Sequence, residues 1–162
     1  MAILGEGLDD LESDSWTKRI ARGTEVEKHL DELELRPRGL HGIEQRPMSR
    51  DNLHTRHYPD IGIQEIPGVL FQAVDGRRSG PHACVIKEQA SIDGARAARN
   101  DGWRVCVIWE MPDGNFMGNL VERLDIVGPI SDAARRKGSG TPAWRITKRS
   151  LVQFETLLAE LR

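Results

Sequence analysis

The stretch from Trp103 to Trp109 constrains the fold more than any other part of this chain, because nearly all of its side chains are apolar. Its sequence is Trp-Arg-Val-Cys-Val-Ile-Trp, which is typical of a strand inside a sheet that is covered on both faces. The alanine-rich segment Glu88 to Asn100 precedes it and favours a helix that Gly102 closes. Pro112-Asp113-Gly114 follows and predicts a turn into a second strand at Asn115 to Val121. These elements predict an α/β fold.

Further elements are expected on both sides of this hairpin. A helix is predicted from Trp16 to Leu35, because Pro37 and Gly39 follow it. A closing helix is predicted from Ser150 to Leu161, with Ser150 and Gln153 as a capping box. Residues 36–57 are expected to form a loop with at most one short strand, and residues 128–142 a basic, flexible loop. Short strands are predicted where β-branched and aromatic residues cluster, at 61–63, 69–74, 83–86 and 144–147.

The length of the chain favours one domain. A chain of 162 residues can bury one hydrophobic core, and residues 16–162 are expected to form it. Residues 1–15 carry acids and no Lys or Arg, which predicts an acidic tail that is disordered or docked elsewhere. No stretch approaches the ~20 apolar residues of a membrane span, and no signal peptide is recognised, so an intracellular protein is expected. Cys84 and Cys106 lie in apolar runs and are expected to be free, buried thiols.

Basic residues gather in two segments, residues 36–57 and 135–149, although the net charge of the chain is only −2. Clustered bases suit contacts to the phosphates of nucleic acid, and solvated loops would explain the same pattern. His41, His54 and His57 lie in or beside the first segment; they could ligate a metal, or they could be exposed or face phosphates. The bases expected to contact nucleic acid are Arg46, Arg50, Arg56, Arg135, Arg136 and Lys137.

Glu27 is expected on the buried face of the first helix. At ~100° per residue it shares a face with Ile20 and Leu30, and Val26 and Leu33 extend that face. A carboxylate aimed at a core is costly unless it is paired, hydrogen-bonded or bound to a metal. Glu27 is therefore a candidate metal ligand, with a partly exposed glutamate at the margin of the apolar stripe as the alternative.

Several short motifs occur in a characteristic order along residues 22–161. They are Arg22-Gly23-Thr24 with Glu27, then Pro59-Asp60, then Ile66-Pro67-Gly68-Val69 at the start of an apolar strand, and finally an alanine-rich helix before a second apolar strand. In this order the chain resembles the PD-(D/E)xK nuclease superfamily, in particular its small phage-type endonuclease- and resolvase-like proteins. The resemblance implies a restriction-endonuclease-like αβββαβ core, a single α/β domain whose mixed β-sheet of about five strands is flanked by helices. It also implies cleavage of DNA with Mg²⁺.

The resemblance assigns a role to each matching position. A glutamate on the first helix, an aspartate, and a Glu-x-Lys pair on the next strand hold Mg²⁺ and activate water in this family. Glu27 matches the helix glutamate and Asp60 the aspartate, which makes these two the implied metal ligands. Gln72 stands in place of the second carboxylate and Val74 in place of the lysine, so the motif is degenerate. Lys87 is a candidate replacement for the lysine, and Glu65 is a candidate ligand in another register.

Two functions remain open on the sequence. The first is a metal-dependent DNA endonuclease or resolvase-like phosphodiesterase, with Glu27, Asp60, Gln72 and Lys87 as catalytic residues and Mg²⁺ as the expected cofactor. The second is a non-catalytic phage accessory or structural protein that binds nucleic acid or protein on a nuclease-like scaffold. DNA is the expected partner, membranes are not, and a homodimer and a phage or host protein partner stay open.

Overall fold

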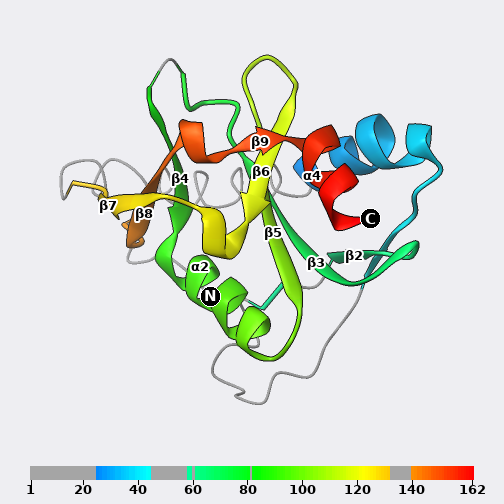
Figure 1. The fold of residues 1–162 in the computed structure, drawn as a ribbon. Helices are drawn as coiled ribbons and strands as arrows, with labels where there is room; N and C mark the ends of the chain where they lie inside the picture. The colour runs from blue at the N-terminus through cyan, green and yellow to red at the C-terminus, as the bar shows by residue number, and fades with distance from the viewer. Residues whose placement is uncertain (1–24, 45–57, 60, 81, 132–139) are drawn as a thin grey trace, which may run out of the picture.

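Two neighbouring strands form the centre of the computed structural model, which describes residues 25–44, 58–59, 61–80, 82–131 and 140–162 (Figure 1). β3 (Ile66–Asp75) and β5 (Arg104–Glu110) run parallel, with Asp75 opposite Glu110 at their carboxyl ends. A parallel pair needs a crossover connection. Here the helix α2 (Gln89–Asn100) lies in that crossover, as its alanine-rich sequence predicts.

The other strands of this sheet run antiparallel to their neighbours. They are β1 (Gly42–Glu44), β2 (Ile61–Ile63), β6 (Phe116–Leu120) and β9 (Val152–Gln153). The sheet has six described strands in the order β1-β2-β3-β5-β6-β9. β5 therefore lies in the interior of the sheet, which confirms the expectation from its apolar sequence.

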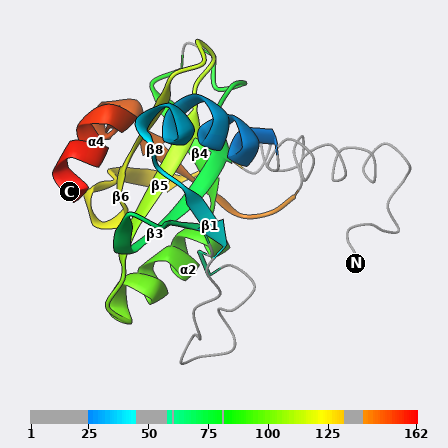
Figure 2. The same ribbon diagram turned by 90° about the vertical axis from the view of Figure 1, so that its right-hand side faces the viewer.

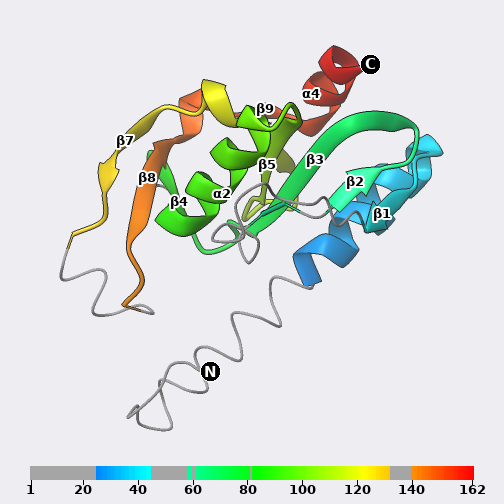
Figure 3. The same ribbon diagram turned by 90° about the horizontal axis from the view of Figure 1, so that it is seen from below.

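A second, three-stranded sheet lies beside α2 (Figure 3). It contains β4 (Cys84–Glu88), β8 (Ala143–Thr147) and β7 (Ile126–Pro129), in the order β4-β8-β7. β7 follows a short 3₁₀ turn, η4 (Val121–Arg123). The sequence does not predict β7, because its glycine and proline are residues that weaken strands; as an edge strand, β7 tolerates the proline.

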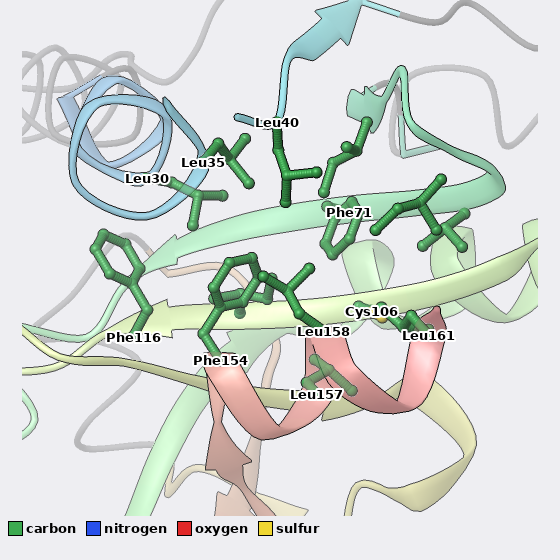
Figure 4. Close-up of a cluster of buried hydrophobic side chains, with 14 of the residues drawn as sticks. Leu30, Leu35, Leu40, Phe71, Cys106, Phe116, Phe154, Leu157, Leu158 and Leu161 are labelled. Atoms are coloured by element: carbon green, nitrogen blue, oxygen red, sulfur yellow. The ribbon is translucent and has the colours of Figure 1, made fainter. Parts of the chain in front are cut away.

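Two clusters of buried side chains cover the two faces of the six-stranded sheet, and Figure 2 shows the helices that flank this sheet. The helix of residues 25–35 and the helix α4 (Phe154–Leu161) cover one face. Phe71 and Phe154 meet there edge to face, with ring centroids 6.3 Å apart, and Figure 4 shows the leucines of both helices around them. This is the first core cluster. The second core cluster lies under α2 on the other face and includes Leu70, Ile92 and Trp109.

The helix of residues 25–35 changes its winding halfway along. Residues 25–30 are α-helical, and Asp31–Leu35 form a π-helical turn (η1). A π turn holds one more residue than an α turn, so Leu35 follows Leu30 on the buried face. Leu35 is 3% exposed, whereas Leu33 is 55% exposed. The prediction that Leu33 extends the buried face is therefore wrong. A 3₁₀ turn, η2 (Arg36–Arg38), and Gly39 with φ 73° then end the helix as predicted.

The closing helix starts later than the sequence predicts. Lys148–Ser150 form a 3₁₀ turn (η5), and α4 begins at Phe154 with no capping hydrogen bond from the Gln153 side chain. Val152 instead pairs with Gly118 of β6, which holds the chain extended where the capping box predicts helix. Strand pairing with a distant segment therefore overrides the local signal.

Both cysteines are free thiols, as expected. Cys106 is completely buried in the first core cluster, and burial raises the pKa of its thiol to about 12. Cys84 is only half-buried. None of the described helices is both long and apolar enough to cross a membrane.

Candidate functional site

Glu27 lines a hollow at the edge of the six-stranded sheet. The hollow has a volume of about 360 Å³, and Asp31 and Glu44 line it together with Leu30, Ile43 and Ile61. Glu27 is exposed, while its neighbour Val26 is completely buried. The expectation that Glu27 points into the core is therefore wrong, because Val26 and Leu30 occupy that face. Glu27 is the partly exposed glutamate that the sequence leaves as the alternative.

Several predicted site residues lie outside the described part of the chain. Asp60 is one of them, although the adjacent Ile61 lines the same hollow as Glu27. His54 and His57 lie outside it too. So do the bases expected to contact nucleic acid: Arg46, Arg50, Arg56, Arg135, Arg136 and Lys137. Their assignments remain predictions.

Gln72 lies on the opposite face of the sheet from the first core cluster. Its amide Nε2 donates a hydrogen bond to the backbone oxygen of Ser91 in α2, at 3.0 Å. Val74, two residues further along the strand, packs against the second core cluster. The strand that matches the Glu-x-Lys motif thus uses these two positions to hold α2 against the sheet.

Lys87 lies on β4 in the second sheet, opposite Trp144 of β8. It is half-buried. Side chains alternate along a strand, so Lys87 projects to the same side as Val85, which belongs to the second core cluster. α2 starts two residues after Lys87, and Gln72 bonds to the third residue of α2. Lys87 and Gln72 therefore both border the start of α2, whereas Glu27 lies at the edge of the sheet in the hollow.

Glu65 and His41 are joined by two hydrogen bonds. The Glu65 carboxylate accepts hydrogen bonds from the His41 backbone N–H at 2.7 Å and from its imidazole Nδ1 at 2.6 Å. These bonds lower the pKa of the Glu65 carboxyl, with the side-chain bond as the largest cause. Glu65 sits in the turn between β2 and β3, so it anchors the chain before β1 to this turn. The alternative that makes Glu65 a metal ligand gains no support.

A cluster of charged residues that the sequence does not predict joins the helix of residues 25–35 to the central strands. We call it the helix–sheet charge cluster. His29 Nδ1 donates to the Glu110 carboxylate, with its oxygens at 3.0 and 3.1 Å, and Glu110 is only 5% exposed. Arg77 donates to Asp75 through Nε at 3.1 Å and to Glu25 through Nη1. The cluster consists of Glu25, His29, Asp75, Arg77 and Glu110.

The register of three elements creates this cluster. Glu25 and His29 are four residues apart, which places them on one face of the helix. Asp75 and Glu110 lie opposite each other at the ends of β3 and β5. The predicted strands end at residue 74 and at Trp109, before Asp75 and Glu110, so only the helical spacing hints at the cluster. Its buried carboxylate is paired, as burial of a charge requires. The cluster fixes the helix that carries Glu27 on the sheet.

The charge cluster makes the stability of this protein sensitive to acid. Hydrogen bonds from Arg77 lower the pKa of the Glu25 carboxyl below its ordinary 4.5. A lowered pKa in the folded state adds stability that is complete above the ordinary pKa and is lost as the pH falls through the folded-state value. As the pH is lowered from about 5 into the acidic range, we therefore expect the free energy of unfolding to fall less steeply in Glu25→Gln than in the wild type.

Urea unfolding of wild type and variant across that pH range measures this difference. Glu155→Gln, which changes an exposed glutamate of α4, is the matched control and should keep the wild-type slope. Equal slopes for Glu25→Gln and wild type would show that the Arg77 contact does not form in solution.

The described residues do not fit a complete Mg²⁺ site. Carboxylate oxygens are the ligands that Mg²⁺ prefers, and Glu27, Asp31 and Glu44 place three carboxylates in the lining of the hollow. Asp31 in the same hollow is already paired with Arg36 at 2.9 Å. Within the described ranges, no three His, Cys, Asp or Glu side chains gather closely enough to hold an ion. The assignment of Asp60 as a metal ligand remains a prediction, because Asp60 lies outside the described residues.

The fold is similar to that of a solved Holliday junction resolvase. The structure of Hjc, a Holliday junction resolvase from the archaeal hyperthermophile Archaeoglobus fulgidus, aligns with a TM-score of 0.55 over 85% of this chain and 96% of that chain, at 13% sequence identity. No protein-family model matches the sequence, and no curated protein matches it significantly. At this identity the likeness concerns the fold, and function depends on the site. This chain therefore has the mixed-sheet α/β fold of a resolvase, as the sequence resemblance implies.

Proposed function

We propose that this protein binds branched DNA on a resolvase-like scaffold and does not cleave it. The observation that carries the proposal is the role of Gln72 and Val74. In an active site of the PD-(D/E)xK type, these positions would carry a carboxylate and a lysine that point to metal and water. Here the Gln72 amide bonds to the backbone of α2, and the partly buried Val74 packs against the second core cluster.

The chemistry of these two side chains supports the loss of catalysis. A glutamine has no charge to attract Mg²⁺, and a valine offers no donor or acceptor. A lysine at position 74 would lose the apolar contact that the partly buried Val74 makes with the second core cluster. In this proposal, positions 72 and 74 of the strand hold α2 against the sheet and take no part in phosphodiester cleavage.

Binding of DNA is supported by the scaffold and by the basic segments. Hjc is a Holliday junction resolvase, and neutralisation of phosphates by Lys and Arg supplies most of the affinity that does not depend on DNA sequence. Arg135, Arg136 and Lys137 belong to the segment that connects β7 to β8. We propose that this segment and the one that holds Arg46, Arg50 and Arg56 contact the DNA backbone.

Binding of a labelled four-way junction, a forked duplex and a linear duplex at several salt concentrations tests this proposal. Each phosphate contact adds about 0.9 to the slope of log K against log salt. Changing Arg135, Arg136 and Lys137 together to alanine should therefore lower the slope by about 2.7. The matched control changes three exposed bases elsewhere, Arg96, Arg123 and Arg162, and should keep the slope. Failure of the wild type to bind any of the three DNAs would overturn the proposal.

A metal-dependent endonuclease is the second candidate function. It is favoured by Lys87, which borders the start of α2 together with Gln72, and by the carboxylates in the hollow beside Ile61. Incubation of the same DNAs with Mg²⁺ or Mn²⁺ separates the two candidates. Cleavage that disappears in Glu27→Ala, Asp60→Ala and Lys87→Ala, and persists in the control Arg96→Ala, would establish the endonuclease and overturn the non-catalytic proposal.

A further inference from the structure

A second cavity, distinct from the Glu27 hollow, opens where the two sheets meet. It has a volume of about 640 Å³, within the range of about 300–1,000 Å³ that is usual for ligand sites. Its walls come from the chain after β3, from β4, from the end of β5 and from β8. We call it the β4 pocket. β4 and β8 belong to the second sheet.

The lining of the β4 pocket combines apolar walls with positive charge. Ile86, Val85 and Ala83 supply apolar surface, and Ile86 is 53% exposed. Arg78, His82 and Arg145 supply the basic groups, all three of them exposed. The carboxylate in the lining, Asp75, is already bound by Arg77 at 3.1 Å. The pocket therefore has a positive charge that its own acid does not neutralise.

The basic side chains are available to a ligand. Within the described ranges, none of the three basic groups forms an ion pair, and the buried Ser79 hydroxyl, which also lines the pocket, has no hydrogen-bond partner. Arg145 lies directly opposite Ile86 in the β4–β8 ladder, so their side chains share one face of the second sheet. A guanidinium thus stands beside an exposed apolar side chain.

The pocket walls are held in place without a ligand. Trp109 Nε1 donates to the backbone oxygen of Ile86 at 3.2 Å, which ties the central sheet to β4. Lys148 Nζ donates to the backbone oxygen of Gly80 at 2.7 Å, and the Lys148 N–H donates to Ala83 at 2.8 Å. A cavity with a fixed wall loses less entropy on binding than a mobile one.

From this lining we infer that the β4 pocket binds an unpaired nucleotide of a DNA strand, so that the protein recognises the single-stranded part of a branched substrate. The inference rests on the proposed DNA-binding function and deepens it. Arg78 and Arg145 pair with phosphates, and the base lies against Ile86 and Ala83. Bases in a duplex are stacked and paired and cannot enter a pocket of this kind, whereas a single strand can. Trp109 is completely buried, so the base contacts aliphatic side chains.

Calorimetric titration of the full chain with the single-stranded trinucleotide dT3 tests the inference, with a blunt duplex and the mononucleotide dTMP as parallel probes. We expect dT3 to bind more tightly than dTMP, because a strand offers phosphates to both arginines. Arg78→Ala and Arg145→Ala should each weaken dT3 binding by roughly tenfold. With a longer single strand such as dT20, the double variant should lower the salt slope by about 1.4, since each contact to a single strand contributes about 0.7. Arg96→Ala, an exposed arginine of α2, is the matched control, and urea unfolding verifies that each variant is folded.

The outcomes separate this inference from the proposed function. Duplex binding without dT3 binding, or dT3 binding that survives both arginine changes, overturns the pocket and leaves DNA binding intact. Equal affinity for dTMP and dT3 indicates a free-nucleotide site and also overturns the inference. Binding of dT3 that depends on both arginines, without binding of duplex or branched DNA, supports the pocket and overturns the wider function.

Discussion

Replacing Gly118 with alanine is expected to destabilise this protein by about 3 kcal/mol or more, a large part of the roughly 5–15 kcal/mol that keeps a domain folded. Gly118 lies on β6 directly opposite Ile108 of β5. A Cβ at this position would overlap the Val107 carbonyl oxygen and stand 2.9 Å from the Ile108 Cα. Both atoms belong to the backbone of an interior strand, so no side chain can turn aside to make room.

The midpoint of urea unfolding, followed by circular dichroism, measures this effect. Gly42→Ala is the matched control, because a Cβ there meets the end of the Leu35 side chain at 3.4 Å and the Asp31 carboxylate at 3.6 Å. The control should unfold close to the wild-type midpoint. A Gly118→Ala variant that unfolds at the same urea concentration as Gly42→Ala would show that β5 and β6 are not packed as closely as the structure has them.

Truncating Trp109 to alanine is the second change with a large expected effect, about 3–5 kcal/mol. Trp109 is completely buried in the second core cluster, where it lies opposite Val74 of β3. Its indole N–H donates to Ile86 of β4. The change therefore opens a cavity and also removes a hydrogen bond that ties the two sheets together.

A conservative variant separates these two losses. Trp109→Phe keeps much of the apolar volume and removes the hydrogen bond, which should cost about 1–2 kcal/mol. Thermal unfolding of the two variants should then show a clearly lower midpoint for Trp109→Ala. If both variants unfold at the same temperature, the hydrogen bond between the sheets matters more than the packing of the indole.

The central strands and α2 could be predicted because their signals are local and agree. Trp103 to Trp109 is apolar on both faces, and the structure buries β5 under both core clusters. The helix before it is predicted within one residue at its start and ends at Asn100 as expected. Where pattern, length and turn residues point the same way, a single sequence suffices.

Predictions failed where distant segments decide the local structure. Leu35 replaces Leu33 on the buried face because the helix takes a π turn, and no sequence pattern announces that extra residue. Val152 is extended because it pairs with Gly118, which lies in another part of the chain. In both cases packing against the sheet outweighs a local preference of a few tenths of a kcal/mol to about 1 kcal/mol.

The candidate sites, too, could be predicted from the sequence only in part. The types of residue at positions 72 and 74, a glutamine and a valine, follow from the sequence alone and already weaken the case for catalysis. Only the structure shows that this part of the strand holds α2, through the hydrogen bond from Gln72 to the Ser91 backbone oxygen. The helix–sheet charge cluster and the β4 pocket also have no sequence signature, because each joins residues far apart along the chain: His29 with Glu110, and Ile86 with Arg145.

The sequence by itself determined the type of fold, the interior strand and the gaps in the nuclease motif, since these depend on residue identity and on periodicity over a few turns. The tertiary structure decided that Glu27 faces a hollow, that His29 is locked to Glu110, and that bases line a pocket beside β4. The physical reason is that strand register and sheet packing bring together side chains that are far apart along the chain, and no local pattern specifies such meetings.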